Sequence, residues 1–172
     1  MNLFKESFII LDKTFKSKND LFESISNILY SENRITSSDN FTKALIKREE
    51  DITTGIGGGI AIPHAKEISV IFPTLIYIRL EEELEYNSLD SKPVKHVFSI
   101  AMPSSYHKEH LTLLSKIANL LQDPQFITSI NELNKFLWNL GYKIKGNKDN
   151  IHPKAFAEVL EQVKGKPEER VV

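Results

Sequence analysis

Two stretches of the chain place apolar residues on both faces of a strand, 74–80 (TLIYIRL) and 94–102 (VKHVFSIAM). Apolar runs of this length are typical of strands that are buried on both faces in the interior of a sheet. A shorter run at 8–11 (FIIL) predicts either a strand or an apolar anchor within a loop. Between the two long runs, the sequence EEELEYNSLDSKP is polar and rich in turn residues. The pattern therefore predicts a sheet with two interior strands.

Helical spacing of apolar residues precedes these strands. Ser17 and Asp20 form a variant of the capping box, and an apolar stripe follows them: Leu21, Ile25, Ile28 and Leu29. A second helix is predicted to begin at Asp39 and to end in Lys47 and Arg48. Both helices present one apolar side, so we expect both to cover the sheet.

The helical period returns after the second long apolar run. From about Tyr106 it places one stripe toward the sheet: His110, Leu114, Ile117 and Leu121. Pro124 suits the first position of a further helix or turn, and Ser129 with Glu132 forms another capping box. Two helices, a group of strands and two more helices predict an α/β fold of the sandwich type.

The length of 172 residues is typical of a single compact domain. Composition changes near the end, because none of the 20 Ile but four of the seven Val lie in 153–172. From about Lys145 the sequence has the character of a linker, a short helix and a polar end. We therefore predict one domain over 1–143 and a polar tail with a short helix over 144–172.

Charge and composition restrict the function. The 22 basic and 23 acidic side chains nearly cancel, which argues against nucleic-acid binding and against attraction to anionic lipid. The absence of cysteine excludes disulfides, thiolate metal sites and cysteine nucleophiles. No apolar run reaches the roughly 18 residues of a membrane span, and the first residues lack a signal-peptide cleavage site. We expect a soluble cytoplasmic protein without direct membrane insertion.

The segment 53–64, TTGIGGGIAIPH, contains four of the seven glycines. Glycine permits positive φ, and consecutive amides in such a loop form a concavity that binds anions. The candidate phosphate-binding residues are Thr53, Thr54, Gly55, Gly57, Gly58 and Gly59. His64 follows a short apolar strand (60–62) and the rigid Pro63, so it is a candidate nucleophile or general base. The alternative is a glycine-rich loop beside an incidental histidine.

Known catalytic and nucleotide-binding motifs do not fit this segment. A P-loop would need Gly-Lys-Ser/Thr after its spacer, and the dinucleotide fingerprint would need glycine where Ile60 stands. The chain also lacks the Gly-x-Ser-x-Gly pattern of esterases. Nucleotide binding and serine hydrolase chemistry are therefore not expected.

His107 and His110 lie at the start of the helix predicted after 106. His110 is either a boundary histidine of the core or, beside the amides of the helix N-terminus, a donor to a phosphoryl oxygen. A zinc pair is a third alternative, but the sequence offers no neighbouring third ligand. His96 and His152 are interpreted as structural or solvated.

Arg48-Glu49 followed by TTGIGGGIAIPHAK resembles the active-site signature of type-2 enzyme IIA domains of the bacterial sugar phosphotransferase system, the fructose/mannitol class. The stretch DSKPVKHVFSIAMPSSYHKEHLTLLSKIANLLQDPQF resembles the second signature of that family. The resemblance covers roughly residues 5–140. It implies an α/β sandwich with a small mixed sheet flanked by helices.

The resemblance also implies a chemistry. In this family, the histidine that matches His64 accepts a phosphoryl group from the phosphocarrier HPr and passes it to a cysteine of an enzyme IIB domain. His110 matches a second histidine that stabilises the phosphoryl group, and Arg48 matches an arginine near the site. Backbone amides of the 53–59 loop would hold phosphoryl oxygens. Neither a cofactor nor a metal is implied.

Two roles remain open for a protein of this kind. One is a phosphocarrier in sugar transport, which the fructose-like second signature favours. The other is a regulatory protein of the nitrogen-related enzyme IIA branch, whose phosphorylation state controls partner proteins. A module cut from a transcriptional regulator is a third alternative.

Overall fold

A computed structural model describes residues 6–106, 108, 111–112, 115–116 and 119. The chain divides into two compact units, Met1–His107 and Lys108–Val172. The described residues of the second unit are helical, and every element named below belongs to the first. The helices predicted near 124 and 129 and the boundary predicted at 143/144 lie outside the described residues.

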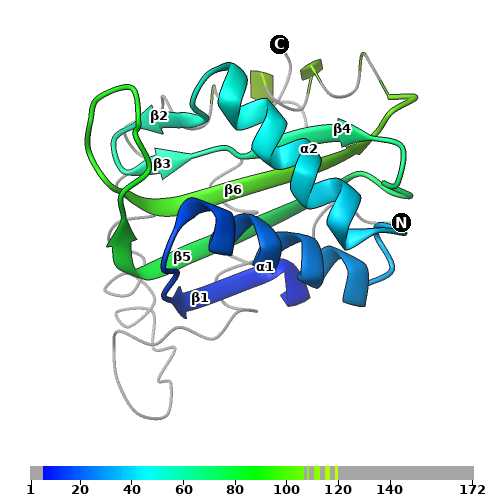
Figure 1. Ribbon diagram of the computed structural model, residues 1–172, viewed down its shortest axis with the longest axis horizontal. Helices are drawn as coiled ribbons and strands as arrows, with labels where there is room; N and C mark the ends of the chain where they lie inside the picture. The colour runs from blue at the N-terminus through cyan, green and yellow to red at the C-terminus, as the bar shows by residue number, and fades with distance from the viewer. Residues whose placement is uncertain (1–5, 107, 109–110, 113–114, 117–118, 120–172) are drawn as a thin grey trace, which may run out of the picture. The chain divides into compact units, whose positions relative to one another are not determined.

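A mixed sheet of six strands forms the centre of the first unit (Figure 1). The strands are β1 Ile9–Lys13, β2 Gly55–Gly57, β3 Ile60–Ala61, β4 His64–Glu67, β5 Thr74–Leu84 and β6 Val94–Pro103. Their order is β1-β5-β6-β3-β2, and β4 also pairs with β6. β6 runs antiparallel to β5 and parallel to β3 and β4, while β1 runs parallel to β5. The two long apolar runs are thus interior strands, as predicted, and the short run at 8–11 contributes a strand.

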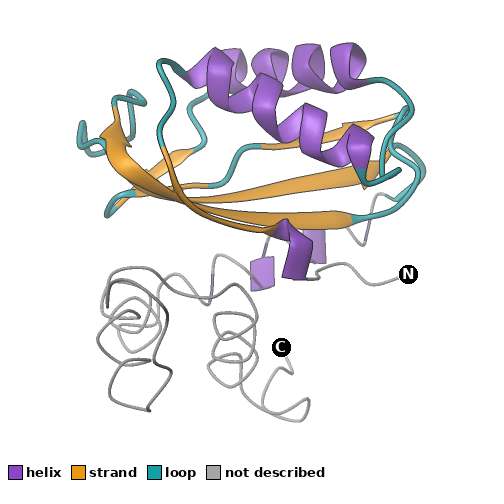
Figure 2. Cartoon of the chain, turned by 90° about the horizontal axis from the view of Figure 1, so that it is seen from below, coloured by secondary structure: helices purple, strands orange, loops and turns teal. Residues whose placement is uncertain are grey.

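Two helices, α1 Lys18–Ser31 and α2 Ser38–Asp51, lie side by side on one face of the sheet (Figure 2). The predicted cap is confirmed, because the Ser17 hydroxyl accepts a hydrogen bond from the Asp20 amide at 3.1 Å. The sequence pattern predicts that the second helix ends at Arg48, but α2 continues to Asp51, so Arg48 lies in its last turn. No helix in the described part of the chain is long and apolar enough to cross a membrane.

The core lies between the helices and the sheet. Its members are side chains that are almost fully buried, including Leu21, Phe22, Ile25, Leu29, Phe41, Leu45, Ile76, Ile78, Leu80, Val97 and Ala101. Most of the helical members are those that the apolar spacing predicts. Alternate residues of a strand point to opposite faces, so β5 and β6 send a second set of buried side chains away from the helices.

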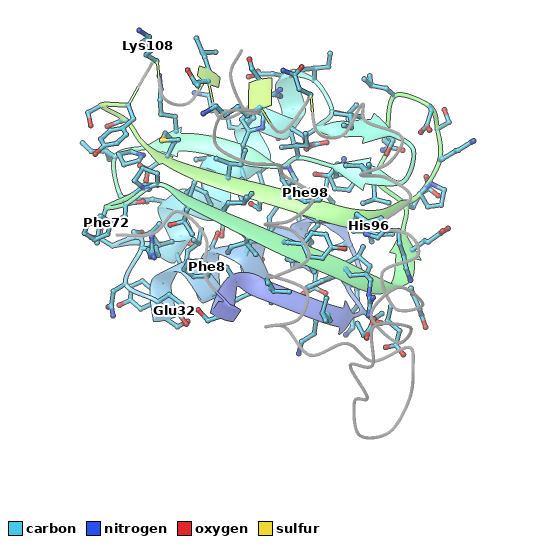
Figure 3. The ribbon with its side chains drawn as sticks, turned by 180° about the vertical axis from the view of Figure 1, so that it is seen from behind. Phe8, Glu32, Phe72, His96, Phe98 and Lys108 are labelled. Atoms are coloured by element: carbon cyan, nitrogen blue, oxygen red, sulfur yellow. The ribbon has the colours of Figure 1, made fainter. Side chains whose placement is uncertain are left out.

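Tyr77 and His96 belong to this second set (Figure 3 labels His96 and its neighbour Phe98). The Tyr77 hydroxyl lies 2.7 Å from Nδ1 of His96, and the two rings stack. Burial raises the pKa of Tyr77, so the phenol stays protonated and shares this hydrogen bond as a neutral group. His96 therefore has a structural position inside the sheet.

We expect Tyr77→Phe to lower the free energy of unfolding by about 1–2 kcal/mol, because it removes this hydrogen bond from a buried pair. Tyr30→Phe is the matched control, since Tyr30 is exposed on α1, and its effect should stay within about 0.5 kcal/mol. Chemical denaturation measures both. Equal effects of the two substitutions would contradict a stabilising role for the buried pair.

Candidate functional site

His64 is placed by an interruption in the sheet. β3 and β4 pair with successive segments of the same strand, β6, and the chain leaves the ladder between them at Ile62 and Pro63. Pro63 still accepts a hydrogen bond from the Ile100 amide at 3.1 Å, and His64 is in register with Ile100. His64, the candidate nucleophile, is therefore the first residue of β4 and not a loop residue after the apolar strand predicted at 60–62. Its backbone is fixed by the central part of the sheet.

The two ring nitrogens of His64 have different partners. Nδ1 lies 2.7 Å from the carbonyl oxygen of Ile62, and the Nε–H group of Arg48 donates to Nε2 at 3.2 Å. A carbonyl only accepts and a guanidinium only donates, so the proton is on Nδ1 and the lone pair is on Nε2. Nε2 is therefore the nitrogen that can attack an electrophile.

The surroundings of His64 favour the neutral ring. Burial is the largest influence and lowers its pKa below the ordinary value of 6.5. The cation of Arg48 lowers the pKa further, whereas the Ile62 carbonyl and the Glu49 carboxylate act in the opposite direction. The net shift is downward. At neutral pH the imidazole is uncharged and keeps its nucleophilic lone pair.

Arg48 reaches His64 from the last turn of α2, which packs against β4 (Figure 1). Its Nη1 donates to the carbonyl oxygen of Ile52 at 2.8 Å, at the residue that ends the helix. The same guanidinium therefore contacts the helix end and the imidazole. Sequence analysis singled out both Arg48 and His64, and the structure brings them into direct contact.

Glu49 is the residue whose importance sequence analysis did not recognise. Its side chain is only 8% exposed and pairs with Lys18 at 3.0 Å. It accepts hydrogen bonds from the Thr53 hydroxyl at 2.9 Å, from the Thr54 amide at 3.0–3.1 Å and from the Thr54 hydroxyl. The Tyr86 hydroxyl adds a contact of 3.4 Å. A signal was present in the sequence, because Glu49 precedes two threonines by four and five residues at a helix end.

The glycine-rich segment forms a tight hairpin between β2 and β3. Its turn requires glycine, because φ is +100°, +65° and +79° at Gly57, Gly58 and Gly59. Gly55 is required for a different reason, since a Cβ atom there would come within 2.4 Å of the Ser88 hydroxyl oxygen.

Several amides of this segment already have acceptors in the chain. The Gly58 amide donates to the Asp90 carboxylate at 2.9 Å, and the Gly55 amide donates to the Thr53 hydroxyl at 3.1 Å. The Thr54 amide donates to Glu49. The role of this loop in binding phosphoryl oxygens stays a prediction.

The remaining candidate histidines, His107, His110 and His152, lie outside the described residues. Within the described part of the chain, no group of three or more His, Cys, Asp or Glu side chains is placed to hold a metal ion. The described site therefore consists of His64, Arg48 and the network around Glu49.

Comparison with known proteins identifies a family. Residues 2–136 match the family model "Phosphoenolpyruvate-dependent sugar phosphotransferase system, EIIA 2". A fructose-specific EIIA component of Haloferax volcanii is 34% identical over 113 residues, which cover 66% of this chain and 73% of that protein. A fructose-specific EIIABC component of Bacillus subtilis is 36% identical over 106 residues, 62% of this chain but only 17% of that longer protein.

A solved structure supports the same assignment. The crystal structure of the nitrogen regulatory protein IIA-Ntr from Neisseria meningitidis superimposes with a TM-score of 0.69 at 33% identity, and the match covers 74% of this chain and 86% of that one. The expected α/β sandwich with a mixed sheet is thus confirmed by the strands and by this relative. The fold, the family model and the relatives agree: the chain belongs to the type-2 enzyme IIA family of the phosphoenolpyruvate-dependent sugar phosphotransferase system.

Proposed function

We propose that the chain is a histidine phosphocarrier, in which Nε2 of His64 takes a phosphoryl group from phospho-HPr and passes it to an enzyme IIB domain. We further propose that this relay serves sugar uptake of the fructose/mannitol class in the cytoplasm. The observation that carries the proposal is the pair of contacts at His64, with Nδ1 at the Ile62 carbonyl and Nε2 at Arg48. These contacts place the Nε2 lone pair of His64 next to the Arg48 cation.

The transfer step follows from these contacts. The Nε2 lone pair attacks phosphorus, a new N–P bond forms, and the N–P bond to the donor histidine breaks, returning its electron pair to the donor ring. Positive charge develops on the His64 ring, and the Nδ1–H bond to Ile62 stabilises it. Transfer to enzyme IIB reverses the roles, because His64 then becomes the leaving group.

The phosphoryl oxygens carry negative charge that the protein must stabilise. The Arg48 Nε–H group must release the Nε2 lone pair before an N–P bond can form there. The guanidinium stays nearby, because Nη1 is anchored on the Ile52 carbonyl, and it then offers its N–H donors to the incoming oxygens. We propose His110 as a second donor and the 53–59 loop as a source of amides, on the strength of the family resemblance.

Exposed apolar side chains near the site suit a protein partner. Ile52 is 57% exposed beside Arg48, and Ile56 in β2 and Leu89 are also exposed. Leu89 lies against β2, because its amide donates to the Gly55 carbonyl at 2.9 Å. Apolar residues around a polar reacting group favour a donor and an acceptor that are proteins.

A regulatory role is the second candidate, and it has a specific observation in its favour. The Neisseria meningitidis relative is a nitrogen regulatory protein and is as similar to this chain as the fructose-specific relatives are. The chemistry at His64 serves both roles equally, so the roles differ in the acceptor. Transfer of label from the phosphorylated chain to purified enzyme IIB domains distinguishes them.

We predict that His64→Ala abolishes phosphorylation by phosphoenolpyruvate, enzyme I and HPr, because it removes the nucleophile. The wild-type chain should gain one acid-labile phosphoryl group, detected by mass spectrometry. His152→Ala is the matched control and should be labelled fully. Full labelling of His64→Ala would contradict the assignment of the acceptor.

Arg48→Gln should slow phosphorylation of His64 by about 100-fold, the scale on which losing one preorganised donor acts. Lys47→Gln removes the same charge from an exposed neighbouring position, and its rate should match that of the wild type. Quenched-flow labelling measures both rates. If the two variants reacted equally fast, Arg48 would have no part in the transfer.

The pH dependence tests the electrostatics of His64. Because the pKa is lowered below 6.5, the ring is mostly neutral at pH 7 and above, so the labelling rate should change little from about pH 8 to 7 and should fall to half its plateau only below pH 6.5. Arg48→Gln should raise the pKa, since it removes a nearby cation. NMR titration of the His64 ring gives both midpoints. A wild-type midpoint above 6.5, or a downward shift in the variant, would contradict this account.

A further inference from the structure

We propose that Glu49 is a positioning residue for phosphoryl transfer: its carboxylate fixes the turn at Thr53 and Thr54 and thereby keeps the Arg48 guanidinium beside Nε2 of His64, where it can meet the incoming phosphoryl oxygens. The inference rests on the proposed function, because it names a further residue on which the same site depends. In this role Glu49 acts through Arg48 and not on the reacting atoms.

Donors from three parts of the chain surround the buried Glu49 carboxylate. Burying a carboxylate is unfavourable unless donors replace the lost water. Here Lys18 supplies a cation, and Thr53, Thr54 and Tyr86 supply hydroxyl and amide donors. Burial and the Glu49 carboxylate raise the pKa of Tyr86, so its phenol stays protonated as a donor. These groups come from α1, the loop after α2, and the segment after β5.

The hydrogen bonds around Glu49 are connected to Arg48 through the residues that end α2. Nη1 of Arg48 is anchored on the Ile52 carbonyl at 2.8 Å, and that carbonyl belongs to the peptide unit that ends at Thr53. The Thr53 hydroxyl and the Thr54 amide are bound to Glu49. The anchor of the guanidinium is therefore fixed immediately beside the bonds that Glu49 makes. With Nη1 held there, Nε is directed at His64.

The charge of the Glu49 carboxylate also bears on the position of Arg48. Arg48 and Glu49 are neighbours of opposite charge, and a carboxylate with free lone pairs would attract the guanidinium away from the imidazole. The Glu49 oxygens are instead bound to Lys18 and to the loop, and Lys18 also lies 4.3 Å from the centre of the Tyr86 ring. Among the described residues, no carboxylate pairs with Arg48. Arg48 thus remains beside the nitrogen that reacts, within reach of the phosphoryl group that arrives there.

The test compares Glu49→Gln with Glu50→Gln, which removes the same charge from the exposed neighbouring residue. The amide that replaces the carboxylate in Glu49→Gln has only one accepting atom, so the Thr53–Thr54 turn loses part of its anchor. The first readout is hydrogen exchange of the Arg48 Nε–H group by NMR in the unphosphorylated protein. The second is the rate of labelling at saturating phospho-HPr, together with the KM for phospho-HPr, in protein shown to be folded by circular dichroism.

We expect Arg48 Nε–H exchange to be about tenfold faster in Glu49→Gln and the maximal labelling rate to fall about tenfold, a conservative figure for a misplaced group. The KM should not change, because the exposed partner surface is untouched. Glu50→Gln should match the wild type in all three measurements. If folded Glu49→Gln kept wild-type exchange and a wild-type maximal rate, the positioning role would be overturned, even if the melting temperature fell.

The same measurements also cover two other cases, a Glu49→Gln variant that does not fold and a wild-type chain that is not labelled. If Glu49→Gln does not fold, Thr53→Val removes one hydroxyl donor at nearly constant volume and should produce a smaller change of the same sign in exchange and rate. Unchanged exchange in folded Thr53→Val would then overturn the proposal. If the wild-type chain is not labelled at all, the proposed function fails, while the exchange measurement still decides whether Glu49 holds Arg48.

Discussion

The hydrogen bond between Nδ1 of His64 and the carbonyl of Ile62 determines most of the chemistry available at this site. It fixes the proton on one ring nitrogen, directs the other toward Arg48, and sets the orientation of the ring relative to the sheet. Without it the imidazole could rotate or exchange tautomers, and neither the lone pair nor the guanidinium would have a defined partner. The two partners are only two residues apart in the sequence, so this hydrogen bond fixes the His64 ring directly to the backbone between β3 and β4.

The fold supplies the rest of the site through two element ends. The last turn of α2 carries the Arg48 cation, and the first residue of β4 is His64, the proposed nucleophile. Because α2 packs on β4, the two side chains meet without any long loop between them. The cation also lies at a helix C-terminus, where the macrodipole favours positive charge. Rigid elements therefore place both groups, which suits the proposed exchange with one protein donor and then one protein acceptor.

Local patterns are sufficient to predict the cap at Ser17 and the two interior strands, because each depends on neighbours in the sequence; they also single out His64, whose reactivity stays a prediction. The pattern places the end of α2 three residues too early, since polar and charged residues at 49–51 carry no apolar periodicity. The role of Glu49 depends on Lys18 and Tyr86, which lie far from it in the sequence and meet it only in the fold. Sequence spacing predicts pairs on one element well, but it does not predict partners that the sheet topology brings together.

At Pro63, the stability of the sheet and the rigid placement of His64 make opposite demands on the sequence. The register along β6 is the same on both sides of Pro63, because Ala61 is in register with Val97 and His64 with Ile100. A residue with an N–H group at position 63 would therefore be placed to add a ladder hydrogen bond to β6. Proline, which has no N–H group to add to a ladder, keeps the two short strands separate. A substitution of Pro63 would therefore add to the stability of the sheet, and it would also release the φ angle that the proline ring fixes next to His64. For the proposed phosphocarrier, Pro63 exchanges one ladder hydrogen bond for a rigid backbone beside the proposed nucleophile.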